Sequence, residues 1–348
     1  MIKGKMTSEK EYRAIKMNSS SSLKEFATNR KKYYKRYVLC EEVEDEETKA
    51  LTMGRVVETK LIEPELFDER FFPSVCESVP TGMMLGFVEA LYKHTKAATN
   101  KEGEVTRNFD EIIEDAYKDS EYKISLDRVV KSFFGSDAEV YYQEIREVRS
   151  KGLTVISLQD AANADKIVEQ LQNDPFIGPI VNLVRSARYD IYNQLQIEGV
   201  EVNGLQLKGM LDKVIVDHTD KIIQVYDLKC SWAVENFYTE YYLYRRGDIQ
   251  AGVYHALANA HFAELIAEGY VVKPPMFIVC DSTAYFAPLV YVLSEEDITD
   301  AFTGFTYKDR QYKGINDIID DLKWAIDNDV WNISRDNYQS GGHVKLKK

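Results

Sequence analysis

The chain has too few cysteines, too irregularly spaced, for a disulfide scaffold or a cysteine-ligated metal. Its 348 residues include only Cys40, Cys76, Cys230 and Cys280, with no CxxC pair among them. Scattered thiols of this kind are typical of a reducing compartment, and no signal peptide precedes them. We therefore expect a cytoplasmic location, in a bacterium or, for a phage-encoded protein, in its host.

Three further motifs are missing. The five histidines show no HxxxH or HxH spacing, which argues against a zinc enzyme. No GxxxxGK[ST] phosphate loop occurs, so any motor that works with this protein is a separate chain. No apolar run approaches the roughly 18–20 residues of a membrane span, and we expect no membrane association.

Positive charge is also scarce. Lys and Arg total 44 against 57 Asp and Glu, for a net charge of −13. This balance disfavours nonspecific binding to nucleic acid over the whole surface, so any such contact must rely on local basic patches and on bound cations. The 45% hydrophobic and 29% charged composition is ordinary for a globular chain of one large domain or two.

What stands out is the stretch from Gly204 to Trp232, which reads as two strands around a turn. At a strand period of two, each run places an apolar row on one face, and only three charged residues interrupt these rows. The first row is Met210, Asp212, Val214 and Val216; the second is Ile223, Val225, Asp227 and Lys229. Rows this apolar are expected to be buried, which argues against the alternative of a hairpin with its charges on a solvated face.

A turn centred on His218 and Thr219 would oppose residues whose numbers sum to 437. Asp212 would then face Val225 and lie diagonal to Asp227, roughly 7–8 Å away on the same side. Two carboxylates at that spacing suit Mg²⁺, which prefers oxygen ligands and completes its shell with water and substrate phosphate. A lysine beside them can position the attacking water or stabilise an anionic transition state.

These residues resemble a known family. GMLDKVIVD, then YDLKCS, then a helix with QAGVYH are similar to the PD-(D/E)XK nuclease superfamily, in particular its RecB-like and exonuclease VIII (RecE-like) branch. The motif falls on Asp212, on Asp227 and Lys229, and on Gln250 and Tyr254. The resemblance implies an α/β fold with a restriction-endonuclease-like core, a mixed central sheet flanked by helices, with an N-terminal helical arm and a helical insertion.

The implied activity is hydrolysis of DNA phosphodiester bonds by a Mg²⁺-dependent deoxyribonuclease, with Mn²⁺ as a substitute. The family assigns catalysis to Asp212, Asp227, Lys229 and Gln250, and DNA contact to Tyr254 is a further expectation. An exonuclease in recombination, repair or phage DNA processing is the first interpretation, with DNA as partner and a recombinase, an annealing protein or a separate motor as associates. A structure-specific endonuclease and a non-catalytic DNA-binding or assembly module stay open, as does homo-oligomerisation.

Some RecB-like nucleases carry an iron–sulfur cluster held by one early and three late cysteines. No cysteine follows Cys280 in this chain, so no iron–sulfur cluster is expected. In the family a helix of the form Gly-x-x-x-His supplies a metal ligand. This chain has Gly54 and then Glu58, so we expect Glu58 to be the third metal ligand; the alternative is a surface glutamate on an amphipathic helix.

The N-terminal arm, residues 1–70, begins with a predicted helix from Leu23 to Val38, capped by Ser22 and Glu25. Arg30 and Lys31 on that helix are candidates for DNA contact, although basic helix faces are often only solvated. A second helix ends at Pro64, because proline cannot continue it. Residues 71–188 read as a helical insertion, with helices at 87–96, 108–118, 125–134, 138–150 and 158–173.

The nuclease core is expected at 189–335 and a flexible tail at 336–348. Within the core we predict strands at 190–202, 204–217 and 221–231, a helix at 245–267, two further strands and one or two closing helices within 295–328. Arg245 and Arg246, near the N-terminus of the 245–267 helix, are candidates for phosphate contact, since a helix N-terminus favours anions.

Overall fold

The structure is a computed structural model that describes residues 9–41, 48–76 and 78–344, so the last four residues of the expected tail lie outside it. The chain divides into two compact units. One comprises the residues up to Ile62 together with those from Ile167 onward, and the other comprises Glu63–Lys166. No helix in the described ranges has the length and apolar character needed to cross a membrane.

The Glu63–Lys166 unit is helical, and its core is rich in aromatic side chains. Phe87, Phe133 and Tyr142 are buried and pack edge to face. The helices expected between Phe87 and Asn173 are confirmed. The elements are η2 (Pro64–Leu66), α5 (Phe67–Arg70), β1 (Phe71–Pro73), α6 (Gly82–Ala97), α7 (Phe109–Asp119), α8 (Leu126–Phe133), α9 (Asp137–Ser150), β2 (Thr154–Ile156) and the first part of α10 (Leu158–Asn173). Strands β1 and β2 pair in parallel, Phe71 beside Thr154.

The other unit is built on a mixed six-stranded sheet in the order β3-β4-β5-β7-β8, with β6 also paired to β5. β3, β4 and β5 are antiparallel to one another, β5 and β7 are parallel, and β7 and β8 are antiparallel. The expected fold class, a mixed central sheet flanked by helices, is confirmed. The strands are β3 (Tyr189–Val202), β4 (Leu205–Asp217), β5 (Ile222–Ser231), β6 (Val271–Val272), β7 (Met276–Asp281) and β8 (Leu289–Val292).

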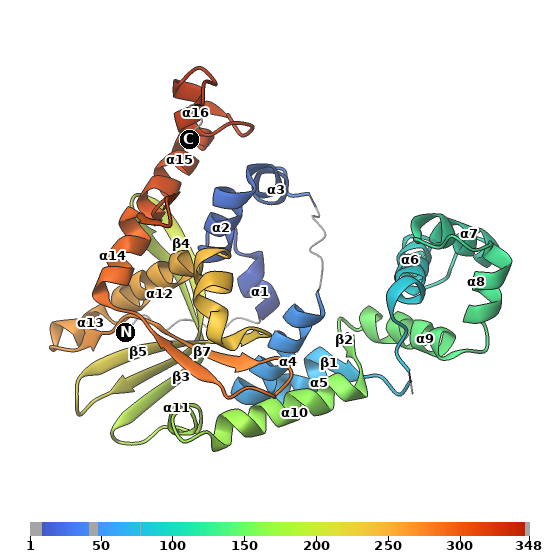
Figure 1. Cartoon of the computed structure of the whole chain (residues 1–348), viewed down its shortest axis with the longest axis horizontal. Helices are drawn as coiled ribbons and strands as arrows, with labels where there is room; N and C mark the ends of the chain where they lie inside the picture. Colours follow the sequence, from blue (N-terminus) through green and yellow to red (C-terminus); the bar gives the residue numbers. More distant parts are fainter. Residues whose placement is uncertain (1–8, 42–47, 77, 345–348) are drawn as a thin grey trace. The chain divides into compact units, whose positions relative to one another are not determined.

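Helix α12 (Gly247–His261) crosses one face of this sheet, and α2 (Ser20–Thr28) lies beside it (Figure 1). Val214 and Val225 from the strands, Leu23 and Phe26 from α2 and Val253 from α12 share one buried core. Gly209 allows this close packing, because a Cβ there would lie 2.3 Å from Leu257 Cδ1 of α12. Gln250 of α12 donates a hydrogen bond to Asp227, so α12 covers the face of β5 that carries this carboxylate, and α2 of the helical arm packs against α12.

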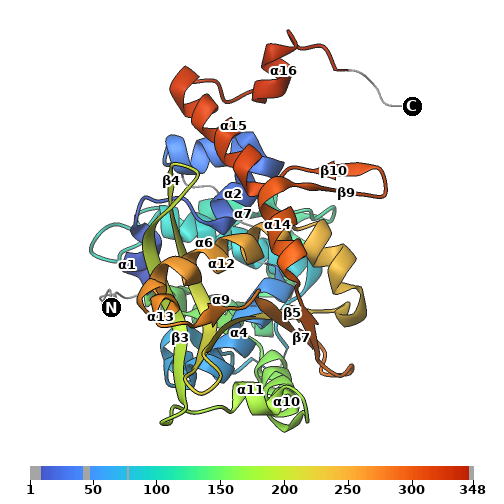
Figure 2. The same cartoon turned by 90° about the vertical axis from the view of Figure 1, so that its left-hand side faces the viewer.

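The remaining elements of this unit are short helices and one hairpin. Between α14 and α15 the chain forms the β9–β10 hairpin (Figure 2), which the sequence patterns did not indicate. The elements are α1 (Glu9–Ala14), α3 (Arg30–Tyr33), η1 (Tyr34–Val38), α4 (Lys49–Ile62), α11 (Gly178–Val181), η3 (Val234–Asn236), η4 (Tyr238–Leu243), α13 (Ala263–Ala267), α14 (Glu295–Thr303), β9 (Phe305–Tyr307), β10 (Arg310–Tyr312), α15 (Ile315–Asn328) and α16 (Arg335–Gln339).

The single helix expected over Leu23–Val38 is wrong. Asn29 leaves the helical conformation at φ −148° and its side chain caps the next segment by accepting from Lys32 N, so α2, α3 and η1 are separate. The predicted Ser22–Glu25 capping box is also wrong. Ser19 and Ser22 form it instead: Ser22 N donates to Ser19 Oγ at 3.4 Å and Ser19 N to Ser22 Oγ at 2.8 Å. Likewise, the predicted 245–267 helix is divided at Phe262 into α12 and α13.

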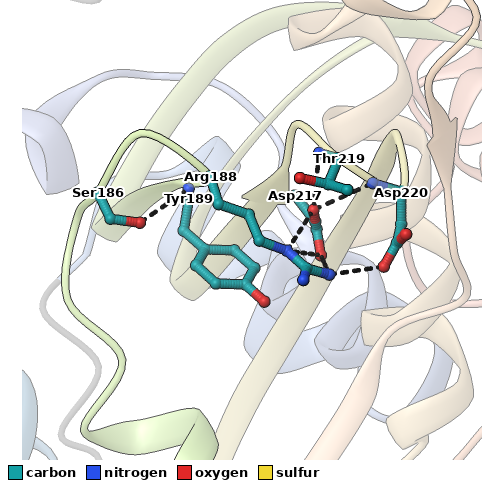
Figure 3. Close-up of polar contacts among 6 residues, drawn as sticks. All are labelled: Ser186, Arg188, Tyr189, Asp217, Thr219 and Asp220. Atoms are coloured by element: carbon teal, nitrogen blue, oxygen red, sulfur yellow. Dashed lines mark hydrogen bonds and ion pairs between the residues drawn. The ribbon is translucent and has the colours of Figure 1, made fainter.

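The turn between β4 and β5 differs from the expected one by a shift of the register. Asp217 pairs with Ile222 and Lys213 with Tyr226, so opposed residue numbers sum to 439 and not to 437. Figure 3 shows the cause: Asp217 Oδ1 accepts hydrogen bonds from Thr219 N at 2.9 Å and Asp220 N at 3.1 Å, while Arg188 bridges Asp217 and Asp220. The carboxylate at the start of the turn organises a four-residue loop, which centres the hairpin between Thr219 and Asp220.

Candidate active site

Asp212 and Asp227 come together at the point where β4 and β5 separate. The predicted register, which puts Asp212 diagonal to Asp227, does not hold, because the observed ladder pairs residues whose numbers sum to 439 and ends one residue before the two acids. The last ladder pair is Lys213 with Tyr226, and the next amide, Leu228 N, donates to Asp212 Oδ2 at 2.9 Å. The Asp212 carboxylate therefore accepts the hydrogen bond of Leu228 N in place of a β4 carbonyl. The β4–β5 ladder ends here, next to the two acids.

Asp227 is held from both sides. It is 1% exposed, the Lys229 ammonium forms an ion pair with its Oδ2, and Gln250 Nε2 donates to its Oδ1 at 2.7 Å. Lys229 stands two residues further along β5 on the same face, as the strand period predicted. The structure thus brings the three charged residues of the hairpin and the helix glutamine into one cluster.

The amide of Gln250 is fixed by four contacts. Its Nε2 also contacts Tyr254 OH at 3.1 Å, one helical turn along α12. Its Oε1 accepts hydrogen bonds from Tyr241 OH at 2.7 Å and from Lys24 Nζ at 3.0 Å. With two donors at its oxygen, the amide must present its NH₂ group to Asp227, so Gln250 orients that carboxylate.

Glu58 projects from α4 toward β3. Gln194 Nε2 donates to Glu58 Oε1 at 2.6 Å, and Gln194 occupies the position in β3 that the register places opposite Asp212. The backbone of Gln194 is in the left-handed region, with a φ of 48°. This conformation costs a non-glycine residue free energy and is found at functional sites. Glu58 therefore lies beside the acid pair and not on an isolated helix surface.

The charges of the cluster act on one another. Burial raises the pKa of Asp212 well above its usual range, and the negative charges of Asp227 and Glu58 raise it further. Burial lowers the pKa of Lys229, but the Asp227 carboxylate, followed by Tyr241 and Asp212, outweighs burial and holds this pKa well above its usual range. The site thus combines mutually repelling acids with a lysine that stays protonated.

The donor set fits a hard divalent cation. Among the described residues no three His, Cys, Asp or Glu side chains stand close enough to form a ready metal cluster, so Glu58 does not complete one as it lies. Two carboxylates suffice for Mg²⁺ when substrate oxygens and water fill the remaining positions. The buried oxygen Gln194 Oε1 accepts no hydrogen bond, whereas Asp227 Oδ2 has the Lys229 ammonium as its partner, which a cation at this oxygen would have to displace or share.

A groove of about 680 Å³ leads to the acids. Glu58, Asp212 and Tyr254 line one part of it, and the segment from Tyr12 to Ser21 lines another. Arg13, Lys16, Arg36 and Lys208 add positive charge to its walls, although Lys208 is buried and donates to the carbonyl oxygens of Tyr12 and Ile15, 2.8 Å each. The groove is acidic at the site and basic along its walls.

The predicted DNA-contacting arginines are mostly engaged inside the fold. Arg246 is buried, pairs with Asp248 at 2.9 Å and donates to Lys313 O at 2.5 Å, so it does not present its guanidinium at the surface as expected. Arg30 pairs with Asp321 and stacks on the Phe26 ring at 4.2 Å. Lys31 and Arg245 are exposed.

The sequence patterns missed three residues of the cluster: Lys24, Gln194 and Tyr241. Each reaches the site from an element outside the hairpin and α12 motif, and the pairs Lys24–Gln250 and Glu58–Gln194 join residues far apart in the chain. Gln194 interrupts an apolar-polar alternation in β3, which gives no indication of a partner on α4. Tyr241 lies nine residues before Gln250 in a π-helical turn, a spacing that helix periodicity does not relate.

Comparisons with known proteins found little similarity in sequence. No protein-family model matches the chain, and no curated protein matches it. Among solved structures, a crystal structure named "Putative exonuclease" from Eubacterium rectale is similar over 99% of this chain and 96% of the other, at 14% sequence identity and a TM-score of 0.47.

Proposed function

We propose that the protein is a metal-dependent nuclease that hydrolyses DNA phosphodiester bonds, acting as an exonuclease in recombination, repair or phage DNA processing. The observation that carries this proposal is the convergence of two buried carboxylates, Asp212 and Asp227, with a protonated Lys229 and an oriented Gln250. A groove with basic side chains in its walls reaches Asp212, and nucleic acid is a polyanion that such side chains attract.

Asp212 and Asp227 would hold Mg²⁺ or Mn²⁺, with Glu58 nearby as a further negative charge. When bound, the cation supplies Lewis-acid polarisation of a phosphoryl oxygen and lowers the pKa of a coordinated water. The raised pKa of Asp212 supports this assignment, because a cation would relieve the repulsion among these three acids.

Lys229 acts as a donor and not as a base. Asp227 keeps its pKa high against the opposing effect of burial, so at neutral pH its ammonium carries a full positive charge. An ammonium aimed at the reacting phosphate can orient the attacking water and stabilise the extra negative charge of the transition state. Gln250 keeps Asp227 in place through the 2.7 Å hydrogen bond, which limits the freedom of the carboxylate.

The experiment compares linear and covalently closed circular double-stranded DNA, each with Mg²⁺ or with excess chelator. The parent is tested beside Asp227→Asn, which removes one carboxylate charge. The matched control is Asp220→Asn, an identical chemical change in the exposed turn at the far end of the same hairpin. We expect the parent and the control to shorten linear DNA with Mg²⁺ only, and Asp227→Asn to lose this activity.

Each other outcome decides a different alternative. Nicking or linearisation of the circle by the parent identifies an endonuclease. DNA binding with no cleavage under any cation identifies a non-catalytic binding module. Equal cleavage by the parent and by Asp227→Asn removes Asp227 from the site and ends the proposal.

A further inference from the structure

Lys24 is a second lysine at the site, contributed by α2. Its ammonium donates to Gln250 Oε1 at 3.0 Å and lies 5.3 Å from the centre of the Tyr241 ring. The Lys229 ammonium lies 5.6 Å from the same ring centre. Both ammonium groups thus lie close to the Tyr241 ring. Lys229 contacts Asp227 directly, and Lys24 contacts Gln250, which donates to Asp227.

The two lysines differ in their counter-charges. Lys229 has the Asp227 carboxylate, and the neighbouring arginines Arg246 and Arg30 are paired with Asp248 and Asp321. Lys24 is partly buried, and within the described residues it contacts no carboxylate at ion-pair distance; its partners are a neutral amide oxygen and an aromatic ring.

The surroundings of Lys24 disfavour its charged form. Burial, followed by the positive charge of Lys229, lowers the pKa of Lys24 to about 7, against the opposing effects of Asp227 and Asp248. A partly buried cation with no acid partner is stabilised when an anion reaches it. The segment that leads into α2 and its first turn, including Ser20 and Ser21, also lines the groove that reaches Asp212.

Orientation of Gln250 alone does not account for Lys24. Tyr241 OH already donates to Gln250 Oε1 at the shorter distance of 2.7 Å, which is enough to fix the direction of the amide. A neutral donor would serve the same purpose without bringing a second positive charge beside Lys229. The hydrogen bonds around Gln250 therefore do not require the positive charge of Lys24.

We propose that Lys24 is a substrate-binding residue whose ammonium holds a phosphodiester oxygen of the nucleic-acid strand at the nuclease site. This inference rests on the proposed function and names a contact that the hairpin motif does not include. Lys24 and Lys229 then have separate tasks: Lys229 serves the reacting phosphate beside Asp227, and Lys24 holds another phosphate oxygen of the strand.

The test measures the affinity for a labelled single-stranded oligonucleotide, with Ca²⁺ in place of Mg²⁺ to slow cleavage, over a series of salt concentrations. The variants are Lys24→Met, Lys24→Gln and Lys24→Arg. Lys24→Gln removes the charge and keeps a hydrogen-bond donor, and Lys24→Arg keeps the charge. Lys273→Met is the matched control, since it removes one lysine charge from an exposed position of the same unit.

We expect Lys24→Met and Lys24→Gln to bind about tenfold more weakly, or about 1.4 kcal/mol. They should also reduce the slope of log affinity against log salt by about 0.7, the value for one phosphate contact on a single strand. Lys24→Arg and Lys273→Met should retain the parent affinity and slope. A residue that only positions Gln250 would not change the slope, so this measurement separates the two roles.

Unchanged affinity and slope in Lys24→Gln, with cleavage lost, would show that Lys24 only positions Gln250 and would overturn the inference while the nuclease proposal stands. A parent that neither binds nor cuts DNA would instead contradict the proposed function. Thermal unfolding of each variant shows whether it is folded, and Lys24→Gln provides the comparison should Lys24→Met not fold.

Discussion

The two oxygens of Asp227 have different partners, and this difference separates the tasks of its neighbours. Oδ1 accepts from Gln250, whereas Oδ2 faces the Lys229 ammonium and accepts no hydrogen bond. A cation at Oδ2 would compete with Lys229 for the same carboxylate. If the protein is the nuclease proposed above, Lys229 would contribute to catalysis while lowering the affinity for the metal.

We expect Lys229→Ala to lower the cleavage rate roughly 100-fold or more, because an aligned donor at a developing charge contributes about this much. Its affinity for Mn²⁺, measured by titration calorimetry without DNA, should equal or exceed that of the parent, since the competing ammonium is gone. Asp227→Asn should lose both affinity and cleavage. Cleavage by Lys229→Ala at the parent rate would contradict the role assigned to Lys229.

Glu58 takes the place of the histidine in the Gly-x-x-x-His pattern that the helix sequence from Gly54 resembles, and its negative charge contributes to the raised pKa of Asp212. We expect Glu58→Gln to weaken cation binding and to lower cleavage strongly, because the site loses one negative charge. Glu58→His should recover part of the activity with Mn²⁺ more than with Mg²⁺, since imidazole suits Mn²⁺ better than Mg²⁺.

Cation titration and cleavage rates of both Glu58 variants check this prediction. The control is Glu201→Gln, at an exposed position of β3. A Glu58→Gln variant that behaves like the control in both measurements would show that Glu58 is not part of the metal site.

At the scale of elements, the β4–β5 turn shows what strand periodicity can and cannot predict. The alternation predicted that Asp227 and Lys229 share one face of β5, and the two side chains form an ion pair. It could not locate the turn centre, because a register that differs by two keeps every side chain on the same face. The hydrogen bonds of Asp217 decide between the two registers, and these depend on Arg188, which lies outside the hairpin.

The same limit explains the remaining errors. The apolar spacing of the first helices was clear, but Asn29 ends α2 by a local side-chain cap, and helix periodicity does not register such a cap. Arg246 looked available for phosphate because its partners, Asp248 and the carbonyl of Lys313, meet it only in the folded chain. Sequence patterns predicted elements and shared faces well; contacts between distant elements needed the structure.

The turn also allows a prediction about acid stability. Hydrogen bonds from Arg188 lower the pKa of Asp217 to about 2, whereas an unfolded aspartate titrates at about 3.9. A depressed pKa stabilises the fold above the unfolded pKa, and this contribution is lost as the pH falls toward 2. The difference in free energy of unfolding between the parent and Arg188→Ala should therefore be full above about pH 4 and shrink below it.

Urea unfolding at several pH values between 5 and 2.5 measures this difference. Asp220→Asn leaves the Arg188–Asp217 pair intact and should keep the pH dependence of the parent. A difference between the parent and Arg188→Ala that stays constant from pH 5 to pH 2.5 would show that the pair does not set the pKa of Asp217.

At the scale of the whole molecule, a cation bound at the acid cluster would stabilise the folded chain. A ligand that binds only the folded chain stabilises it by about 2.7 kcal/mol at a concentration 100 times its dissociation constant. We expect Mg²⁺ or Mn²⁺ to raise the melting temperature of the parent relative to excess chelator, and to leave that of Asp227→Asn nearly unchanged. Scanning calorimetry with both cations checks this, and equal shifts in both proteins would place the cation elsewhere.

The parallel pair of β1 and β2 has a consequence for how the chain folds. The Glu63–Lys166 unit interrupts the unit that contains the six-stranded sheet, so the arm bearing Lys24 and Glu58 must find β4, β5 and α12 across a long intervening segment. Pairing of Phe71 with Thr154 joins the two ends of that segment, which shortens the loop to be closed about fivefold and lowers its entropic cost by about 1.4 kcal/mol.

We therefore expect the β1–β2 pair to speed folding of the sheet-containing unit. Phe72→Pro, which removes an amide donor from the middle of β1, should slow refolding of the catalytic unit, as followed by the recovery of cleavage after dilution from urea. It should leave the final activity close to that of the parent. Refolding at the parent rate, with β1 shown to be disrupted, would mean that the two halves of the active site meet without help from the segment between them.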